Sequence, residues 1–405
     1  MIGTTFATNA LLGMLTDWVG KKIGPAVKVT FKTFIDFLTS AKKDKDGITH
    51  VDLDPIYITL VAPRGAGKTS LLATVISYIN NNITKADGFT VSPCTETDGT
   101  RIAQFNSVLS ARMQAGSFKF DSGFLRPDNE LSKFDFELKF NVENEKTVLH
   151  QKFIVMDIPG GWISDNIAFP TEFTEHFHKS RILWIPIEAP ALMEVDYKSE
   201  SEMGHSANVL CIERVGEFIK EWAAIRNKED EPCSANFAIT KCETYHTQDD
   251  TKTKAAKCQL RFKDRYQEII NDVHKISNKI KMNYVPIETI GVVKIYDREW
   301  WCTEEGRSVL KADYKFTQRR VSPQISGVDA LMSTVLEYCY TALDSRINND
   351  IEVLNKAIDD SLFAFKEKKM KEALLSFHKK IEPLKEKMLQ LKQPTKFSLD
   401  YSISL

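Results

Sequence analysis

The stretch Ile56-Tyr-Ile-Thr-Leu-Val-Ala-Pro-Arg-Gly-Ala-Gly-Lys-Thr-Ser-Leu-Leu72 decides the fold. Its first six residues are apolar or β-branched, which predicts a buried strand. Two glycines follow at 65 and 67, and a leucine-rich stretch begins at Leu71. A strand, a glycine-bearing loop and a helix N-terminus in this order predict a phosphate-binding loop, because the free backbone N–H groups of such a turn bind anions.

The residue types of this loop suit a nucleoside triphosphate with its metal ion. Gly65 and Gly67 allow positive φ angles and a close approach of the backbone to phosphate. Lys68 is expected to reach the β- and γ-phosphates, and the Thr69 hydroxyl is expected to ligate Mg²⁺. The usual motif begins with a glycine where this chain has Ala62. The predicted phosphate-binding residues are Arg64, Gly65, Ala66, Gly67, Lys68, Thr69 and Ser70.

The composition is that of a globular protein with two or three domains. The chain has 405 residues, of which 42% are hydrophobic and 27% charged, and its net charge is -1. This balance gives no general attraction to nucleic acid or to an anionic membrane. The seven cysteines form no C-x-x-C pair, and no stretch carries the roughly 18 apolar residues of a membrane-spanning helix. A cytoplasmic protein with reduced thiols is expected.

Strand and helix patterns alternate through the middle of the chain. The predicted strands are 134–140, 148–156, 182–187, 236–239 and 283–287, and the predicted helices are 69–81, 171–179, 208–226, 252–276 and 328–343. Such alternation predicts an α/β fold with a mostly parallel sheet and helices on both faces. The hairpin at 134–156 is expected to add one antiparallel edge strand. Two insertions are predicted, a mostly irregular one at about 84–130 and one with β character at about 291–322.

Helical extensions are predicted at both ends of the chain. The division is a helical extension and linker over 1–48, a nucleotide-binding domain over 49–345, and a helical extension over 346–405. Residues 1–40 fit either a helical hairpin packed on the domain or an interfacial helix that contacts a membrane or a partner. Residues 366–392 carry a local charge of +5, which fits a coiled-coil or partner-binding helix as well as a helix folded back with solvated lysines.

Polar residues follow the predicted strands at the edge where α/β sheets bind ligands. Asp157 comes directly after the apolar run at 153–156 and is followed by Pro159, Gly160 and Gly161. Asp157 is a candidate to hold Mg²⁺ through water, and Gly160 is a candidate to sense the γ-phosphate. If this motif is considered alone, an aspartate that only begins a Pro-Gly turn is an equally good interpretation.

This order of motifs resembles that of Ras-like and translation-factor-type P-loop GTPases, over about residues 50–345. The resemblance implies GTP/GDP and Mg²⁺ as ligands, with Lys68, Gly160 and Gly161 at the reaction centre. It also implies that a threonine of the first switch loop caps the Mg²⁺ ion. Thr95, Thr97 and Thr100 are the candidates, and Thr97 is the one chosen. The residues implied to surround the base are Thr240, Lys241, Glu243, Glu288 and Thr289.

The chain departs from the GTPase pattern in three places. Thr240 stands where asparagine is usual, and Glu243 stands where aspartate reads guanine. The motif that ends at Gly160 is followed by Gly161 and Trp162, where Ras-like enzymes place a water-orienting glutamine. Slow hydrolysis is therefore expected. Arg64 or Arg101, or an arginine of a partner, is a candidate to stabilise the transition state. The chain is also similar to GTPases of bacterial conflict systems, some of which are thought to act beside a second GTPase-like protein.

The expected function is therefore a slow, Mg²⁺-dependent GTPase that switches a protein partner through its terminal helices. A P-loop ATPase is an alternative, because the base-reading motif is degenerate. A nucleotide-holding scaffold with little turnover is another, because the glutamine is missing. No nucleic-acid partner is predicted.

Overall fold

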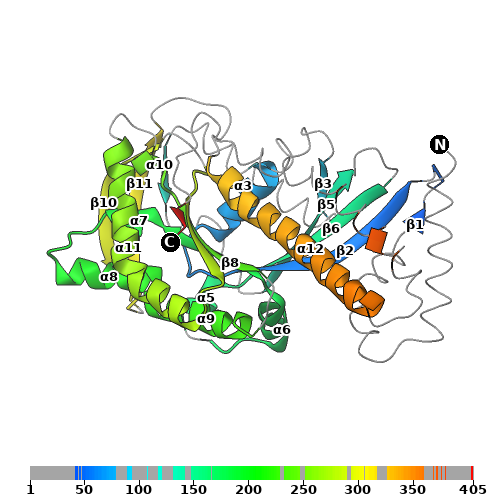
Figure 1. The fold of residues 1–405 in the computed structure, drawn as a ribbon. Helices are drawn as coiled ribbons and strands as arrows, with labels where there is room; N and C mark the ends of the chain where they lie inside the picture. The colour runs from blue at the N-terminus through cyan, green and yellow to red at the C-terminus, as the bar shows by residue number, and fades with distance from the viewer. Residues whose placement is uncertain are drawn as a thin grey trace.

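A computed structural model gives the fold, and Figure 1 shows it as a ribbon. The structure describes residues 42–43, 45–46, 48–78, 89–93, 107, 117–120, 131–141, 147–165, 167–228, 232–246, 251–289, 293–304, 306–316, 326–359, 368, 371–372, 375, 379 and 403–404. The predicted extension over 1–40, the candidate residues Thr95, Thr97, Thr100 and Arg101, and most of the predicted C-terminal extension lie outside these residues.

One large, mostly parallel sheet organises the chain. Its strand order is β12-β9-β8-β7-β2-β6-β5-β3, with β1 paired to β2. The strands are β1 (Lys42–Lys43), β2 (Thr49–Leu60), β3 (Phe89–Pro93), β5 (Ser132–Asn141), β6 (Thr147–Asp157), β7 (Ile182–Glu188), β8 (Cys233–Thr240), β9 (Ile280–Pro286) and β12 (Ile403–Ser404). Strands β9, β8, β7, β2 and β6 are parallel to one another, which confirms the predicted α/β class.

The edges of the sheet differ from the prediction of a single antiparallel edge strand. Strand β5 is antiparallel to β6 as expected, but β3 pairs antiparallel on its far side, so β5 is not an edge. Strand β12 adds an antiparallel partner to β9, and β1 adds one to β2. The short strands β3 and β4 also lie in the segment predicted to be irregular. These strands are recognised by their pairing with a neighbouring strand, because strands of five residues or fewer show little hydrophobic pattern in the sequence.

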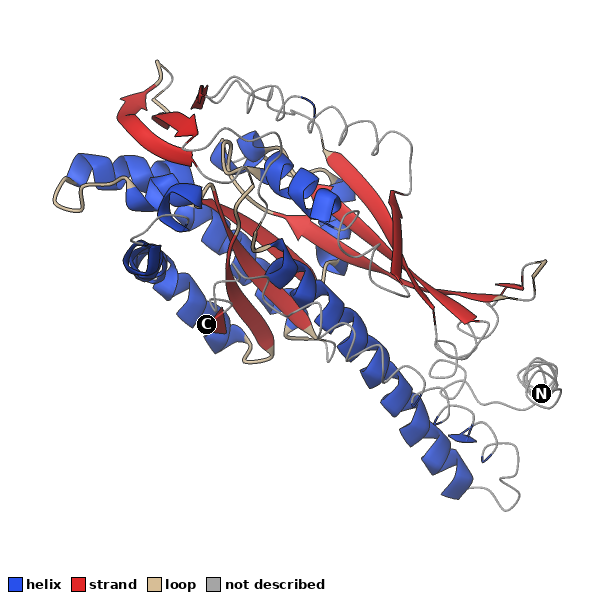
Figure 2. Cartoon of the chain, turned by 90° about the horizontal axis from the view of Figure 1, so that it is seen from above, coloured by secondary structure: helices blue, strands red, loops and turns tan. Residues whose placement is uncertain are grey.

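Two hydrophobic cores cover the two faces of the sheet. The helices are α3 (Lys68–Tyr78), α5 (Gly160–Ser164), α6 (Thr171–Lys179), α7 (Ala189–Met193), α8 (Glu200–Leu210), α9 (Ile212–Arg226), α10 (Glu243–His246), α11 (Thr251–Ile276) and α12 (Val328–Asp359). Along β7, Ile182 and Trp184 pack with α3 and α12, while Leu183 and Ile185 pack with α6, α9 and α11. This alternation explains why the strand is apolar throughout. Figure 2 shows α12 as the long helix that crosses the molecule, and it shares its side of the sheet with α3.

Two helix predictions need correction. The helix predicted over 208–226 is divided by Cys211, whose φ of 46° ends α8 and begins α9. A single left-handed residue breaks the helix without interrupting the apolar periodicity, so the pattern did not reveal the break. The helix predicted over 328–343 continues to Asp359, so the predicted boundary at 345 falls inside α12.

A second, antiparallel sheet is formed by the predicted insertions. It has the order β10-β11-β4, with β10 at Val293–Cys302, β11 at Ser308–Phe316 and β4 at Ser117–Phe120. The β character predicted for 291–322 is therefore confirmed, and a strand of the other insertion joins it. The sheet attaches to the residues after β7, because Trp300 Nε1 donates to the Glu194 carbonyl at 2.9 Å.

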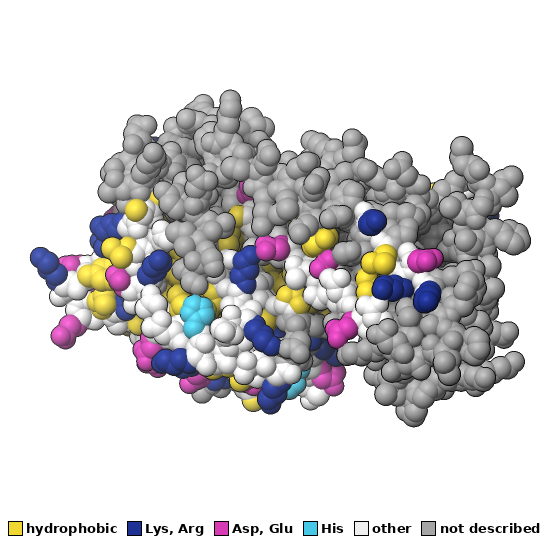
Figure 3. All heavy atoms as spheres, viewed as in Figure 1, with side chains coloured by type: hydrophobic (Ala, Val, Ile, Leu, Met, Phe, Trp, Pro, Cys, Tyr) yellow, Lys and Arg dark blue, Asp and Glu magenta, His cyan; other side chains and the backbone are white. Residues whose placement is uncertain are grey.

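One face of the described surface carries charged side chains of both signs. On the face drawn in Figure 3, Lys and Arg side chains alternate with Asp and Glu, and apolar side chains lie between them. Within the part of the chain that the structure describes, no helix is both long and apolar enough to cross a membrane.

Candidate functional site

The loop between β2 and α3 turns back over the end of the parallel sheet. Gly65 and Gly67 have φ angles of +82° and +84°, which residues with a side chain rarely adopt. Helix α3 begins at Lys68, directly after the second glycine. The predicted strand, glycine loop and helix start are thus present in order, and the first turn of α3 directs backbone N–H groups toward the loop.

Lys68 places its ammonium inside the curve of this loop. Its Nζ donates to the Ala62 carbonyl at 3.1 Å and to the Pro63 carbonyl at 3.4 Å. Asp157 Oδ1 lies 4.0 Å from the same Nζ, because β2 and β6 are parallel neighbours with Leu60 opposite Asp157. A cation from the start of α3 and a carboxylate from the end of β6 therefore meet under the loop, and both side chains are only about a tenth exposed.

The segment after β6 packs directly against the loop. A Cβ added to Gly160 would lie 2.5 Å from the Arg64 backbone nitrogen, and one added to Gly161 would lie 2.4 Å from Arg64 Nη2. Arg64 Nη2 is 3.6 Å from Asp165 Oδ2, which also accepts a hydrogen bond from Arg307 Nη2 at 3.2 Å. Arg307 comes from the turn between β10 and β11, so the second sheet reaches the same place.

Strand β8 joins the loop from the other side through Thr240. Its hydroxyl donates to the Ala66 carbonyl at 2.7 Å, with the Ile187 carbonyl at 3.2 Å as an alternative acceptor. The next residue, Lys241, has a φ of 55° and donates from Nζ to Glu188 Oε1 at 2.6 Å. Burial lowers the pKa of Lys241 below its ordinary value, and the charge of Glu188 opposes this effect.

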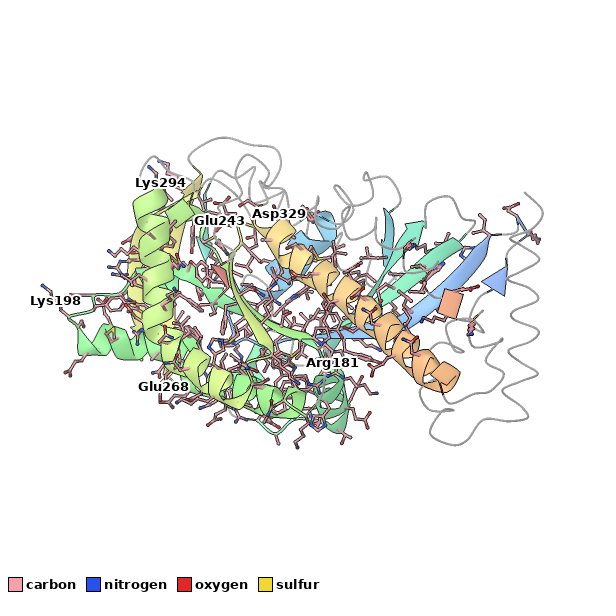
Figure 4. The ribbon with its side chains drawn as sticks, viewed as in Figure 1. Arg181, Lys198, Glu243, Glu268, Lys294 and Asp329 are labelled. Carbon is pink, nitrogen blue, oxygen red and sulfur yellow. The ribbon has the colours of Figure 1, made fainter. Side chains whose placement is uncertain are left out.

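Glu243 and Glu288 form a buried acidic pair beside these residues. Glu243 Oε1 accepts hydrogen bonds from the Thr289 backbone N–H at 2.7 Å and from its hydroxyl at 3.2 Å. Glu288 Oε2 accepts from the Ser326 hydroxyl at 2.8 Å. Burial, and then the charge of Glu243, raise the pKa of Glu288 to about 7, while the Ser326 bond lowers it. Figure 4 labels Glu243, and also Asp329 at the start of α12.

The predicted residues thus fall into two adjacent groups. The first holds Arg64, Gly65, Ala66, Gly67, Lys68, Asp157, Gly160, Gly161, Thr240 and Lys241. The second holds Glu243, Glu288 and Thr289, where Glu243 is 2% exposed and bonds to the protein itself. Thr69 and Ser70 lie in the first turn of α3, and Thr97 lies outside the described residues.

Three residues of the site were missed by the sequence reasoning. Glu188 ends β7 and pairs with Lys241, and the rule that ligands gather at the ends of parallel strands could have found it. Asp165 and Arg307 are 142 residues apart and meet only in the folded chain, and no local pattern announces that contact.

A scan against models of known protein families gives no match for this chain, and a search of curated proteins gives none either.

Proposed function

We propose that this protein binds guanine nucleotides with Mg²⁺, hydrolyses GTP slowly, and acts as a nucleotide-controlled switch on a protein partner. The observation that carries the proposal is the loop itself. Two glycines with positive φ precede a helix that begins with Lys68, and Asp157 lies 4.0 Å from the Lys68 ammonium. This combination suits a P-loop, in which backbone N–H groups and one lysine neutralise phosphates.

The phosphates would replace the loop's own carbonyls as partners of Lys68. Its ammonium now donates to the carbonyls of Ala62 and Pro63, and the γ-phosphate carries more negative charge than a carbonyl. Hard oxygen donors suit Mg²⁺, so the Thr69 hydroxyl and the Asp157 carboxylate would hold the ion, with a first-switch threonine such as Thr97 as a further ligand. Bound Mg²⁺ would neutralise charge on the β- and γ-phosphates.

Slow hydrolysis follows from the residues after Asp157. Gly161 and Trp162 offer no side-chain amide to orient water. The Arg64 guanidinium lies against Gly161 and is a candidate to stabilise charge on the transferring phosphoryl group in cis. Asp165 lies 3.6 Å from that guanidinium, so a movement of residues 157–165 would change where Arg64 points.

Glu243 is the residue on which selection of the base depends. Guanine reading would require the Glu243 carboxylate, which bonds to the Thr289 N–H and hydroxyl. Nucleotide binding must exchange those bonds for bonds to the base, at a cost of roughly 1–3 kcal/mol. This observation favours ATP as the alternative nucleotide, and a scaffold with little turnover as the alternative to a switch.

Helix α12 would connect the proposed nucleotide site to a protein partner. The helix begins two residues after Ser326, whose hydroxyl bonds to Glu288 beside the proposed base site. Its 32 residues extend about 48 Å toward the C-terminal extension. A shift at Glu288 would therefore be transmitted to the terminal helical segments, where we place a cytoplasmic protein partner of the GTPase-like kind.

Calorimetry with Mg²⁺ and GTP, GDP or ATP tests the proposal on the full chain. A GTP preference above tenfold, about 1.4 kcal/mol, is expected, and Lys68→Ala should weaken GTP binding at least tenfold. Lys281→Ala, an exposed lysine paired with Glu337, is the matched control and should bind like the wild type. Unchanged GTP binding by Lys68→Ala would refute the site, and equal ATP binding would select the ATPase alternative.

A further inference from the structure

A cluster of histidines and carboxylates lies at the opposite end of β2 and β6. The parallel register places Asp52 opposite His150, and His50 precedes Asp52 by two residues on the same face of the strand. On the other side of β6, Lys139 of β5 pairs with His150, so Glu137 also lies on this face. Three adjacent strands therefore direct ligand-type side chains to one place.

The side chains of this cluster already lie close together. One ligand atom each from Asp52, Glu137 and His150 lies within 4.8 Å of the others. His150 Nδ1 is 3.1 Å from Glu137 Oε1, and His150 Nε2 is 2.8 Å from His50 Nδ1. Lys139 Nζ lies 3.4 Å from Glu137 Oε2, so the lysine and His150 contact different oxygens of that carboxylate.

A β-bulge next to the cluster shapes it. The register of β2 and β6 shifts between Leu53 and Ile56, so that Asp54 and Pro55 oppose Lys152 alone. The buried Gln151 side chain donates to the Asp54 carbonyl at 2.8 Å and satisfies the backbone of the bulge. Bulges re-aim neighbouring side chains and are frequent beside functional sites.

We propose that Asp52, Glu137 and His150 bind a divalent transition-metal ion, of which Zn²⁺ is the representative. His150 Nδ1 and one oxygen of each carboxylate would be the ligands. With Nδ1 on the ion, the Nε2–H of His150 donates to His50 Nδ1, which makes His50 a positioning residue that fixes the ring and its tautomer. An imidazole ligand selects Zn²⁺ and related ions over Mg²⁺, which prefers oxygen ligands alone.

This site is separate from the proposed nucleotide site. Asp52 and Leu60 are eight residues apart along β2, which corresponds to roughly 25 Å. Three protein ligands leave a coordination position for water or a substrate group, as in zinc sites that are not purely structural. The same two strands would thus carry an ion at their start and phosphates at their end.

Zn²⁺ titration of the purified full chain, by calorimetry and by competition with a chromogenic chelator, tests the proposal. The wild type is expected to bind one ion, and His150→Gln and Asp52→Asn should each weaken binding at least tenfold. His50→Gln removes no ligand, but it should weaken Zn²⁺ binding by about 10–100-fold because His50 positions the His150 ring. His274→Gln, an exposed histidine of α11, is the matched control and should change nothing.

X-ray absorption spectroscopy then identifies the ligands. Nitrogen and oxygen neighbours with imidazole scattering support the site. Sulfur neighbours would place the ion at a cysteine, such as Cys302 beside His205, and would overturn the proposal. Wild-type affinity in both His150→Gln and Asp52→Asn would overturn it too. Asp52 is exposed, so its variant remains informative if His150→Gln does not fold. Lys68→Ala should leave Zn²⁺ affinity unchanged, which separates this result from the nucleotide proposal.

Discussion

The two ends of strands β2 and β6 gather polar groups in different ways. At their carboxyl ends the chain leaves the sheet, and the loop over 61–67 offers backbone groups, with Lys68 as the central side chain. At their amino ends both strands are paired, and the polar groups are the side chains of His50, Asp52 and His150.

The difference follows from where backbone hydrogen bonds are used. Within a ladder the N–H and C=O groups bond to neighbouring strands, so only side chains can bind a ligand. Beyond the ladder, backbone groups become available, and their positions depend on φ and ψ. Changes of backbone shape should therefore damage the loop end, and changes of side-chain chemistry should damage the other end. The first of four predictions tests this contrast directly, and the other three measure how much individual side chains stabilise the loop end and its surroundings.

The largest effect is expected for Gly160→Ala. The added Cβ would lie 2.5–2.7 Å from backbone atoms of Pro63 and Arg64, so the loop or the segment after β6 must move. We expect a loss of about 3 kcal/mol in the free energy of unfolding, measured in urea, and weaker nucleotide binding with unchanged Zn²⁺ binding. Gly204→Ala in helix α8 is the control. Apart from its chain neighbours and the helix's own nearby backbone, no atom would lie within 4 Å of the added Cβ, so a gain of about 0.5–1 kcal/mol is expected. Equal stability of Gly160→Ala and wild type would show that the loop end tolerates a change of shape.

The next largest effect is the pH dependence of the free energy of unfolding that Glu288 confers. Its folded pKa of about 7 lies above its unfolded value, so the folded state binds more protons between these two pH values. The free energy of unfolding should therefore fall as the pH rises from about 5 to 7, and Glu288→Gln should remove on the order of 2 kcal/mol of this fall. Urea titrations at pH 5 and 7.5 measure it. Glu268→Gln, on the exposed side of α11, should keep the wild-type slope, and a wild-type slope in Glu288→Gln would contradict the assignment.

Thr240→Val probes the bond between β8 and the loop. The substitution keeps the shape but leaves the buried Ala66 carbonyl without the hydroxyl at 2.7 Å, so a loss of about 1–2 kcal/mol is expected in thermal or urea unfolding. Thr341→Val removes an exposed hydroxyl bond to the Glu337 carbonyl in α12 and should cost less than about 0.5 kcal/mol. If the two variants were equally stable, the loop would not depend on β8.

The smallest effect is expected for Arg307→Ala. Its bond to Asp165 is solvent-exposed, and exposed ion pairs contribute about 0–1 kcal/mol. Lys275→Ala, which removes an exposed pair with Asp272 in helix α11, is the control and should behave alike in urea. A loss above about 2 kcal/mol for Arg307→Ala alone would mean that the second sheet is a structural part of the loop end.

Most of the parallel sheet could be predicted because each strand carries its own apolar pattern. The helix predicted over 171–179 matches α6 at both ends, whereas the strand predicted from Ile56 begins seven residues earlier, at Thr49, and ends at Leu60. The break at Cys211 and the strands β3 and β4 could not be predicted, because they depend on one backbone angle and on pairing partners.

For the candidate site, the sequence indicated Gly65, Gly67 and Lys68 as one unit, since they are adjacent in the chain. It indicated Asp157 through the rule for strand ends, and Thr240 through the resemblance to P-loop GTPases. The metal roles of Thr69 and Thr97 and the base-reading role of Glu243 stay predictions.

The sequence by itself determined the alternating α/β architecture and the glycine loop, because hydrophobic periodicity and glycine placement act over a few residues. Only the tertiary structure decided which distant groups meet. The register of β2, β6 and β5 brings His150 to Asp52 and Glu137, and the docking of the second sheet brings Arg307 to Asp165. Such contacts depend on strand order and register, which are set by the packing of the whole chain rather than by any one segment.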